Sequence, residues 1–398
     1  MTIAYLLEVI FIYFFLINIL GYFGVEYYRS TKNFEKNEGV DVNRRIIFAV
    51  PVHNEVNAFI NSLKFWLGIF PDNENWHLVF VTQNICNKEA VFIREHFESS
   101  ANLNGKKNIQ LIFDKTSEFS TKVTKLNSVT EELMLSDNDY LGVFDIDTRI
   151  KKITFLELEE SISNGSDVIQ IVPISTAESS NILNNSLLFF RNRRNLSLEY
   201  GLTKLANVNS LYRNVLAMHY FSGASFFIRF SHLTKLGGLP DKNDDILLGY
   251  YHTLDKGTIS VLNSYSYSCL PNSSLSNYFY HRVRILDMVF TRNESLVVKN
   301  KNKTRHKLIS IYSFLRDHYL DYATFPVLAI NIKMGLLLIP LLMIESLYLK
   351  KKLGRKIHAF ALFEPILCSF IYFLEINLYI LAKMFNSRML YSREPTAK

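Results

Sequence analysis

Cysteine is scarce in this sequence. The 398 residues include three cysteines, Cys86, Cys269 and Cys368, which are odd in number and lie far apart. None belongs to a C-x-x-C motif or to a Cys/His spacing that would suit zinc. The sequence therefore argues against a disulfide framework and against a zinc site, and it favours a reducing compartment.

Several functional motifs are missing as well. No G-x-G-x-x-G and no G-x-x-x-x-G-K-[ST] follows an expected strand, so neither a Rossmann dinucleotide site nor a P-loop is supported. No run of Lys and Arg alternates with aromatic residues, and we expect no nucleic acid partner. The N-terminus has no basic segment and no small-residue cleavage site, which predicts an uncleaved anchor rather than a signal peptide.

Apolar and aromatic residues, in contrast, are abundant. Hydrophobic residues make up 48% of the chain, which contains 31 Phe and 22 Tyr and carries a formal net charge of +7. This composition predicts contact with membrane lipid. The excess positive charge suits an anionic lipid surface or a phosphate-bearing ligand.

Three apolar segments predict membrane helices, at residues 2–24, 325–349 and 357–382. Basic residues such as Arg29 and Lys32 follow the first segment, so the positive-inside rule places most of the chain in the cytosol. The last two segments enclose the basic stretch KKKLGRK, at 350–356. Either both segments span the bilayer as a hairpin, or 325–349 is re-entrant or interfacial. We favour the hairpin, which makes the chain a multi-pass protein of a cell membrane, expected to be a bacterial inner membrane.

Between these segments, residues 44–310 alternate between strand and helix patterns. Short apolar runs at 44–52, 76–83, 108–114, 139–147 and 166–174 are separated by stretches with helical spacing. This alternation predicts βαβ units and a mostly parallel central sheet, so the fold class is α/β. Ligands of such sheets bind at the C-terminal ends of the strands.

Two aspartates follow the fourth apolar run, in YLGVFDIDTRI at 140–150. In extended chain, residues two apart point to the same side, so Asp145 and Asp147 would face one place. Two carboxylates held close together repel each other, and a divalent cation between them relieves that repulsion. The alternative is a solvated loop in which one aspartate caps the next helix.

Six motifs in order resemble the family-2 inverting glycosyltransferases, which include the hyaluronan, chitin and cellulose synthases and many bacterial surface-polysaccharide enzymes. PVHNE at 51–55 is similar to the P-x-x-N-E of that family, and DID at 145–147 to its D-x-D. The other four are KVTKLN at 122–127, FSGASFFIRFSHLTKLGGLP at 221–240, NDDILLGYYHTLDKG at 243–257 and HRVRI at 281–285. In KVTKLN, Lys125 stands where the family has a small residue.

The resemblance implies a GT-A-like nucleotide-diphospho-sugar transferase domain and assigns roles to individual residues. Asp245 would be the catalytic base, with Asp244 as the fallback, although the same NDD could cap a helix. Asp147, with Asp145, would hold Mg²⁺ or Mn²⁺ against the diphosphate. The remaining donor-binding residues implied are Pro51, Glu55, Lys122, Asp145 and Arg284.

Three of these roles have a structural alternative. Glu55 could stabilise the first turn of a helix, Lys122 could lie on a solvated helix face, and Arg284 could contact lipid headgroups. His53 is expected to be a spacer.

The sequence departs from the family at two places. The second strand is followed by VTQNICN at 81–87, which lacks the acidic pair that contacts the base. The last motif has His281 and Ile285 where processive members have Gln and Trp. The expected function is therefore transfer of single sugars from a nucleoside diphosphate sugar to a lipid-linked or polysaccharide acceptor, in cell-surface glycan synthesis. A processive synthase and an inactive assembly subunit are the alternatives.

Overall fold

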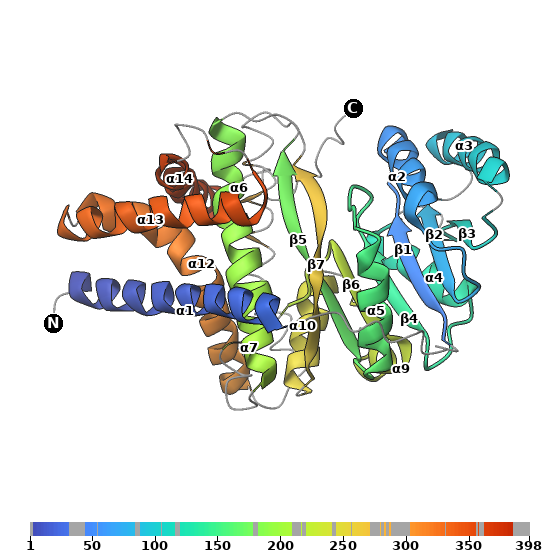
Figure 1. The fold of residues 1–398 in the computed structure, drawn as a ribbon, viewed down its shortest axis with the longest axis horizontal. Helices are drawn as coiled ribbons and strands as arrows, with labels where there is room; N and C mark the ends of the chain where they lie inside the picture. The colour runs from blue at the N-terminus through green and yellow to red at the C-terminus, as the bar shows by residue number, and fades with distance from the viewer. Residues whose placement is uncertain are drawn as a thin grey trace. The chain divides into compact units, whose positions relative to one another are not determined.

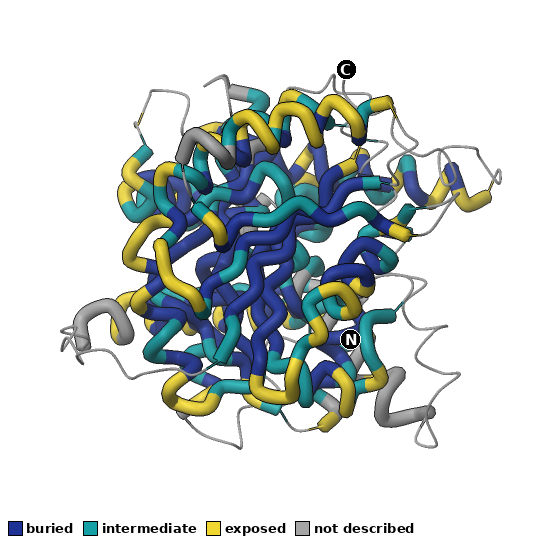
Figure 2. The backbone as a smooth tube through the Cα atoms, turned by 90° about the vertical axis from the view of Figure 1, so that its right-hand side faces the viewer, coloured by how far each residue is buried: buried dark blue, intermediate teal, exposed yellow. Residues whose placement is uncertain are grey.

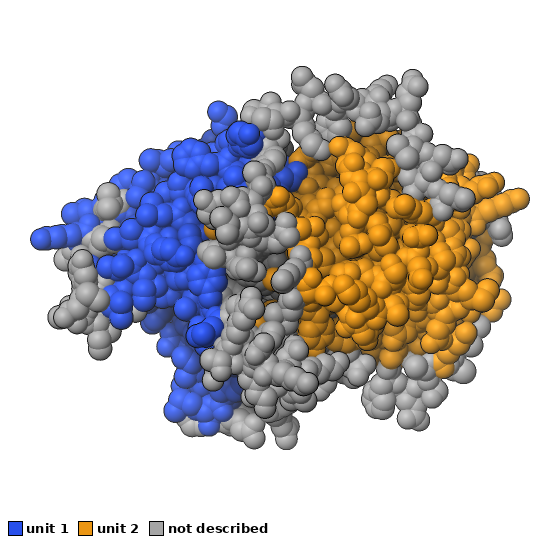
Figure 3. Space-filling model, turned by 90° about the horizontal axis from the view of Figure 1, so that it is seen from below, with its two compact units in different colours: residues 1–27, 175–205, 269–397 blue, residues 28–174, 206–268, 398 orange. Residues whose placement is uncertain are grey.

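The computed structural model describes residues 3–31, 44–53, 55–83, 88–104, 106–115, 120–177, 182–208, 216, 220–240, 244–255, 257–270, 279, 282–283, 286–287, 303–330, 332–355, 357 and 362–384. The chain divides into two compact units (Figure 3). Unit 1 contains residues 1–27, 175–205 and 269–397, and unit 2 contains residues 28–174 and 206–268.

Helices and strands alternate along most of the described chain (Figure 1). In chain order the elements are α1 (Ile3–Thr31), β1 (Ile46–Pro51), α2 (Val56–Ile69), β2 (Trp76–Thr82), α3 (Lys88–Asn104), β3 (Ile109–Phe113), α4 (Lys122–Glu132), β4 (Tyr140–Phe144), α5 (Ile153–Ser163), β5 (Val168–Ala177), α6 (Ile182–Arg194), η1 (Asn195–Leu202), α7 (Thr203–Val208), β6 (Ser225–Arg229), α9 (Phe230–Lys235), α10 (Asp244–Leu254), β7 (Ile259–Leu270), α12 (Lys303–Ile330), α13 (Ile332–Lys352) and α14 (Glu364–Met384).

The strands form a seven-stranded sheet in the order β3-β2-β1-β4-β6-β5-β7. Strands β3, β2, β1 and β4 pair in parallel with one another, and β6 is antiparallel to both β4 and β5. The expected α/β class with a mostly parallel sheet is confirmed. Strands β6 and β7 were not expected, and β6 separates β4 from β5.

Helices cover both faces of the parallel part of this sheet. Phe48 and Val50 of β1 lie in one buried apolar cluster with residues of α2 and α5, among them Trp66 and Phe155. Helix α4 packs against β1, β2 and β3 but contributes no residue to that cluster. Since alternate side chains of a strand point to opposite faces, α4 covers the other face. Strands β1 and β4 are buried at every position, and Figure 2 draws such buried backbone in dark blue.

Unit 1 is built from helices and contains buried charge. Arg193 on α6 lies 3.0 Å from the carboxylate of Asp321 on α12 and 3.6 Å from that of Glu345 on α13. Asn18 and Tyr22 on α1 donate hydrogen bonds of 2.8 and 2.7 Å to the same Glu345 carboxylate. These contacts connect α1, α6, α12 and α13. From the sequence alone, the charged residues would be expected on the protein surface.

Within the part of the chain that the structure describes, two helices are long and apolar enough to cross a bilayer. They are α1, over Glu8–Tyr27, and α14, over Glu364–Met384. The expected segments 2–24 and 357–382 overlap them. The described helices divide the expected segment 325–349 between the end of α12 and most of α13.

Candidate functional site

The two aspartates of DID lie in a turn that directly follows β4. The amide of Asp145 donates a 3.2 Å hydrogen bond to the Ala224 carbonyl, next to β6. Its own carbonyl accepts from the amide of Thr148 at 3.0 Å, and the Thr148 hydroxyl also donates to Ala224. The neighbouring antiparallel strand therefore fixes the turn from one side, and both aspartates are partly exposed in it.

Arg149 also forms hydrogen bonds within this turn. Its guanidinium donates to the carbonyls of Ile146 and Thr148, at 2.9 Å each, and lies 5.0 Å from the centre of the Phe65 ring. Burial lowers the pKa of Arg149, and the nearby Asp147 carboxylate opposes that shift. The sequence motif did not single out Arg149, which has no signature beyond its position two residues after DID.

Lys122 contacts this turn from the first turn of α4. Its Nζ donates 3.0 Å hydrogen bonds to Asp145 Oδ1 and to the Gly223 carbonyl. The side chain is 25% exposed, so it does not lie on a solvated helix face. The start of α4 is fixed by a capping box between Thr121 and Thr124.

Gly223 in turn lies against Asp245, in the first turn of α10. A Cβ on Gly223 would overlap Asp245 Oδ2. Asp245 Oδ1 accepts a 2.9 Å hydrogen bond from the amide of Ile246, the next residue of the same helix. Asp244 begins α10, and its side chain lies outside the described residues.

The end of β1 carries the other part of the expected donor site. Pro51 is buried and is the last residue of β1, opposite Val81 of β2. Glu55 directly precedes α2, yet its side chain makes no capping hydrogen bond there. His53, between them, is exposed and is bound through Nδ1 by the amine of Lys125. No spacing in the sequence indicates a contact between His53 and Lys125.

The structure thus brings part of the predicted site together in unit 2. Lys122 links Asp145 to Gly223, and Gly223 contacts Asp245; we call these four residues the strand-end cluster. The predicted Arg284 lies outside the described residues, as do His281 and Ile285.

Arg282, close to Arg284 in sequence, is described and belongs to unit 1. It is buried and forms an ion pair of 3.0 Å with Glu375 of α14. Its guanidinium is therefore committed to a helix contact within that unit.

The two carboxylates of DID suit a hard divalent cation only if a bound ligand supplies the remaining oxygen atoms. Among the described residues, no group of three or more His, Cys, Asp and Glu side chains could hold a metal. Asp145 is already paired with an ammonium, and Asp147 supplies a second carboxylate. Mg²⁺ and Mn²⁺ accept such a sparse protein set when phosphate oxygens fill the other positions.

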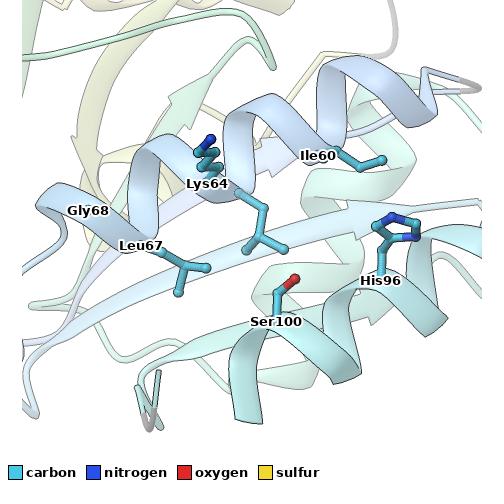
Figure 4. A pocket seen from close by; sticks show the side chains of 7 residues that line it. Ile60, Lys64, Leu67, Gly68, His96 and Ser100 are labelled. Atoms are coloured by element: carbon cyan, nitrogen blue, oxygen red, sulfur yellow. The ribbon is translucent and has the colours of Figure 1, made fainter. Parts of the chain in front are cut away.

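A separate hollow of about 410 Å³ lies between α2 and α3 (Figure 4). Among the residues that line it are Ile60, Lys64 and Leu67 of α2 and His96 and Ser100 of α3. None of the predicted site residues lines this hollow.

Sequence comparison matches the chain to no protein family and to no curated protein. Structural comparison finds the mannosyltransferase PcManGT from Pyrobaculum calidifontis, solved in complex with GDP-Man and Mn²⁺. The two chains are 14% identical with a TM-score of 0.56, over 96% of this chain and 99% of the other. TarS of S. aureus, residues 1–349 in complex with UDP-GlcNAc, is 13% identical with a TM-score of 0.42, over 86% and 92% of the two chains. The first comparison shows that this chain and the mannosyltransferase share a fold.

Proposed function

We propose that this protein is a membrane-anchored, inverting glycosyltransferase that transfers a sugar from a nucleoside diphosphate sugar to a lipid-linked or glycan acceptor. The observation that carries the proposal is the strand-end cluster, in which Lys122 connects Asp145 to the Gly223 segment that contacts Asp245. It lies at the C-terminal end of parallel strands, where ligands of such sheets bind. The overall fold, shared with a mannosyltransferase whose structure contains GDP-Man and Mn²⁺, supports the same reading.

Donor binding is assigned to groups around DID and the end of β1. Asp147, with Asp145, would hold Mg²⁺ or Mn²⁺, which when bound neutralises charge on the diphosphate. Lys122 contributes a second positive charge beside the same turn. Pro51 and Glu55 lie at the end of the adjacent strand, where the nucleoside part of the donor would extend.

Asp245 is proposed as the general base. The acceptor hydroxyl oxygen attacks the anomeric carbon while Asp245 takes the hydroxyl proton. The bond between that carbon and the β-phosphate oxygen breaks, and its electron pair leaves with the nucleoside diphosphate. Attack from the side opposite the leaving group inverts the anomeric centre.

The surface of α1 supports membrane anchoring. Exposed apolar and aromatic residues recur along this helix, mostly three or four positions apart: Leu6, Val9, Ile12, Tyr13, Leu16, Leu20, Phe23 and Tyr27. Over that length a helix extends about 30 Å, the thickness of a hydrocarbon core. Helix α14 also exposes apolar side chains, including Phe370, Leu374 and Ile380. Both helices are proposed to lie in the bilayer, close to a lipid-linked acceptor.

The test is incubation of membranes containing the full chain with labelled UDP-, GDP- and dTDP-sugars, with Mn²⁺ or with EDTA. We expect one donor to be consumed, metal to be required, and mass spectrometry to show a single added sugar. A ladder of many added sugars would favour the processive alternative. Failure of every donor, with folded protein, would favour the inactive subunit.

A further inference from the structure

Lys125 is a fully buried lysine beneath the end of β1. Its side chain is 0% exposed, and Nζ donates hydrogen bonds to the Val52 carbonyl at 2.7 Å and to His53 Nδ1 at 2.8 Å. A buried ammonium is costly unless it is well bonded. An apolar or small residue would fill this helix position at lower cost, so the amine has a specific task.

The hydrogen bond from Lys125 to the Val52 carbonyl fixes the main chain directly before His53 and Glu55. The Val52 amide donates to the Val81 carbonyl at 2.7 Å, which continues the pairing of β1 with β2. The Val52 carbonyl accepts from Lys125. Both polar groups of Val52 are therefore held, and the direction in which His53 and Glu55 leave the strand is set.

The other bond fixes the protonation of the His53 ring. An ammonium can only donate hydrogen bonds, so His53 Nδ1 must be the acceptor. The imidazole is then neutral, with its proton on Nε2. A small residue at position 125 would leave both tautomers accessible.

Lys122 and Lys125 lie three residues apart and therefore on one side of α4. Lys122 holds the DID turn and the Gly223 segment, while Lys125 holds the end of β1. One helix thus fastens three segments that the proposed function assigns to the donor and the base.

We propose that Lys125 is a positioning residue for the nucleoside diphosphate, acting through the Val52 carbonyl and through the tautomer of His53. This inference rests on the proposed function, because it assumes that the donor binds over the ends of β1 and β4. Lys125 itself does not contact the donor; it sets the geometry of residues that do.

Because the role of Lys125 depends on its charge, nucleotide affinity should depend on pH. Burial lowers the pKa of Lys125 to about 8, although the carboxylates of Asp114 and Glu55 partly oppose the shift. Below that pH the amine is charged and His53 is held in one tautomer. Above it the neutral amine can also accept, so the constraint on His53 is lost and nucleotide binding weakens. The titratable side chain in contact with the amine is His53.

The experiment measures the affinity of the full-length, detergent-solubilised protein for GDP and UDP with Mn²⁺, by calorimetry at pH 7 and pH 9. For wild type we expect weaker binding at pH 9. Lys125→Met, which keeps the side-chain length, should bind about tenfold more weakly at pH 7, the effect of losing roughly one well-placed hydrogen bond. It should also show no further loss at pH 9. Lys235→Met, which removes an exposed lysine paired with Asp255, is the matched control and should behave as wild type.

A second variant separates positioning from simple destabilisation. His53→Phe removes the imidazole that accepts the hydrogen bond from Lys125. Lys125→Met should therefore lower the nucleotide affinity less in the His53→Phe background than in the wild-type background. If Lys125→Met does not fold, nucleotide affinity is compared at pH 7 and pH 9 for wild type and for His53→Phe. The positioning role predicts a smaller loss of affinity at pH 9 for His53→Phe than for wild type. Equal affinity of wild type at both pH values, or of Lys125→Met and wild type, overturns the positioning role while leaving the proposed function standing. Absence of nucleotide binding by wild type would overturn both.

Discussion

Gly223 and Asp245 are in direct contact: Asp245 Oδ2 occupies the space that a Cβ on residue 223 would need. The close approach holds the carboxylate of the proposed base beside a segment whose carbonyl accepts from Lys122. The base and the DID turn are therefore connected through one glycine and one lysine.

Replacement of Gly223 by alanine should displace the Asp245 carboxylate. We expect kcat to fall about 10- to 100-fold, the usual cost of misplacing a reacting group by about an ångström, with little change in the Kd for the donor. Steady-state kinetics and calorimetry check this. Gly68→Ala in α2 is the control, because a Cβ there meets nothing within 4 Å. An unchanged kcat for Gly223→Ala would show that the contact is not needed for transfer.

Replacement of Lys122 by methionine should weaken donor binding by about tenfold, because a charge-assisted hydrogen bond to Asp145 and a positive charge near the diphosphate are lost. The Kd for GDP or UDP with Mn²⁺ is the measurement. Lys115→Met, which breaks an exposed ion pair with Glu132, is the matched control. In the Asp145→Asn background the same change should cost less, and a full tenfold loss there would mean that the two residues act independently.

The buried His232–His252 pair predicts acid sensitivity of unit 2. Their rings are joined by a 2.7 Å hydrogen bond between His232 Nε2 and His252 Nδ1. Burial lowers the pKa of His252 to about 4, with His232 adding to the shift; burial also lowers the pKa of His232. Asp167 and Asp255 oppose both shifts, and Lys235 and Arg229 add to that of His232.

Because the folded pKa is below the unfolded value of about 6.5, the unfolded chain binds the proton more tightly. Stability is therefore complete above pH 6.5 and falls as the pH decreases from 6.5 towards 4, by up to about 3 kcal/mol for His252. Denaturant unfolding at pH 7.5, 5.5 and 4.5 measures this. His252→Gln should flatten the dependence and exposed His96→Asn should not; a wild-type curve flat over this range would contradict the assignment.

Removal of the buried Arg193 should destabilise unit 1. Arg193→Met leaves the carboxylates of Asp321 and Glu345 buried without their cation, which costs about 3–5 kcal/mol. Thermal unfolding in detergent is the measurement. Arg94→Met, which breaks an exposed pair with Glu98, is the control and should leave the melting temperature nearly unchanged. The triple variant with Asp321→Asn and Glu345→Gln should recover part of the loss; no recovery would mean that packing, rather than charge, dominates.

The sequence predicted the local elements of the sheet better than its long-range pairing. The first five strands coincide with apolar runs, since a strand buried on both faces is continuously apolar. Strand β6 lies in a stretch taken as a motif, and nothing local indicates that Ser225–Arg229 inserts between β4 and β5. At the site, DID and Asp245 were found as motif residues. Arg149 and the Lys125–His53 pair were missed, because their roles depend on tertiary hydrogen bonds that no spacing encodes.

The central claim is that Asp245 is the base of a sugar transfer from a nucleoside diphosphate donor. The most direct test is the single-turnover rate of Asp245→Asn beside Asp244→Asn and wild type, with the donor Kd measured for each. We predict that Asp245→Asn keeps the donor Kd and lowers the rate by about two to four decades, the contribution of a positioned general base. Equal rates for Asp245→Asn and wild type would contradict the account, and a large loss only in Asp244→Asn would move the base to the neighbouring residue.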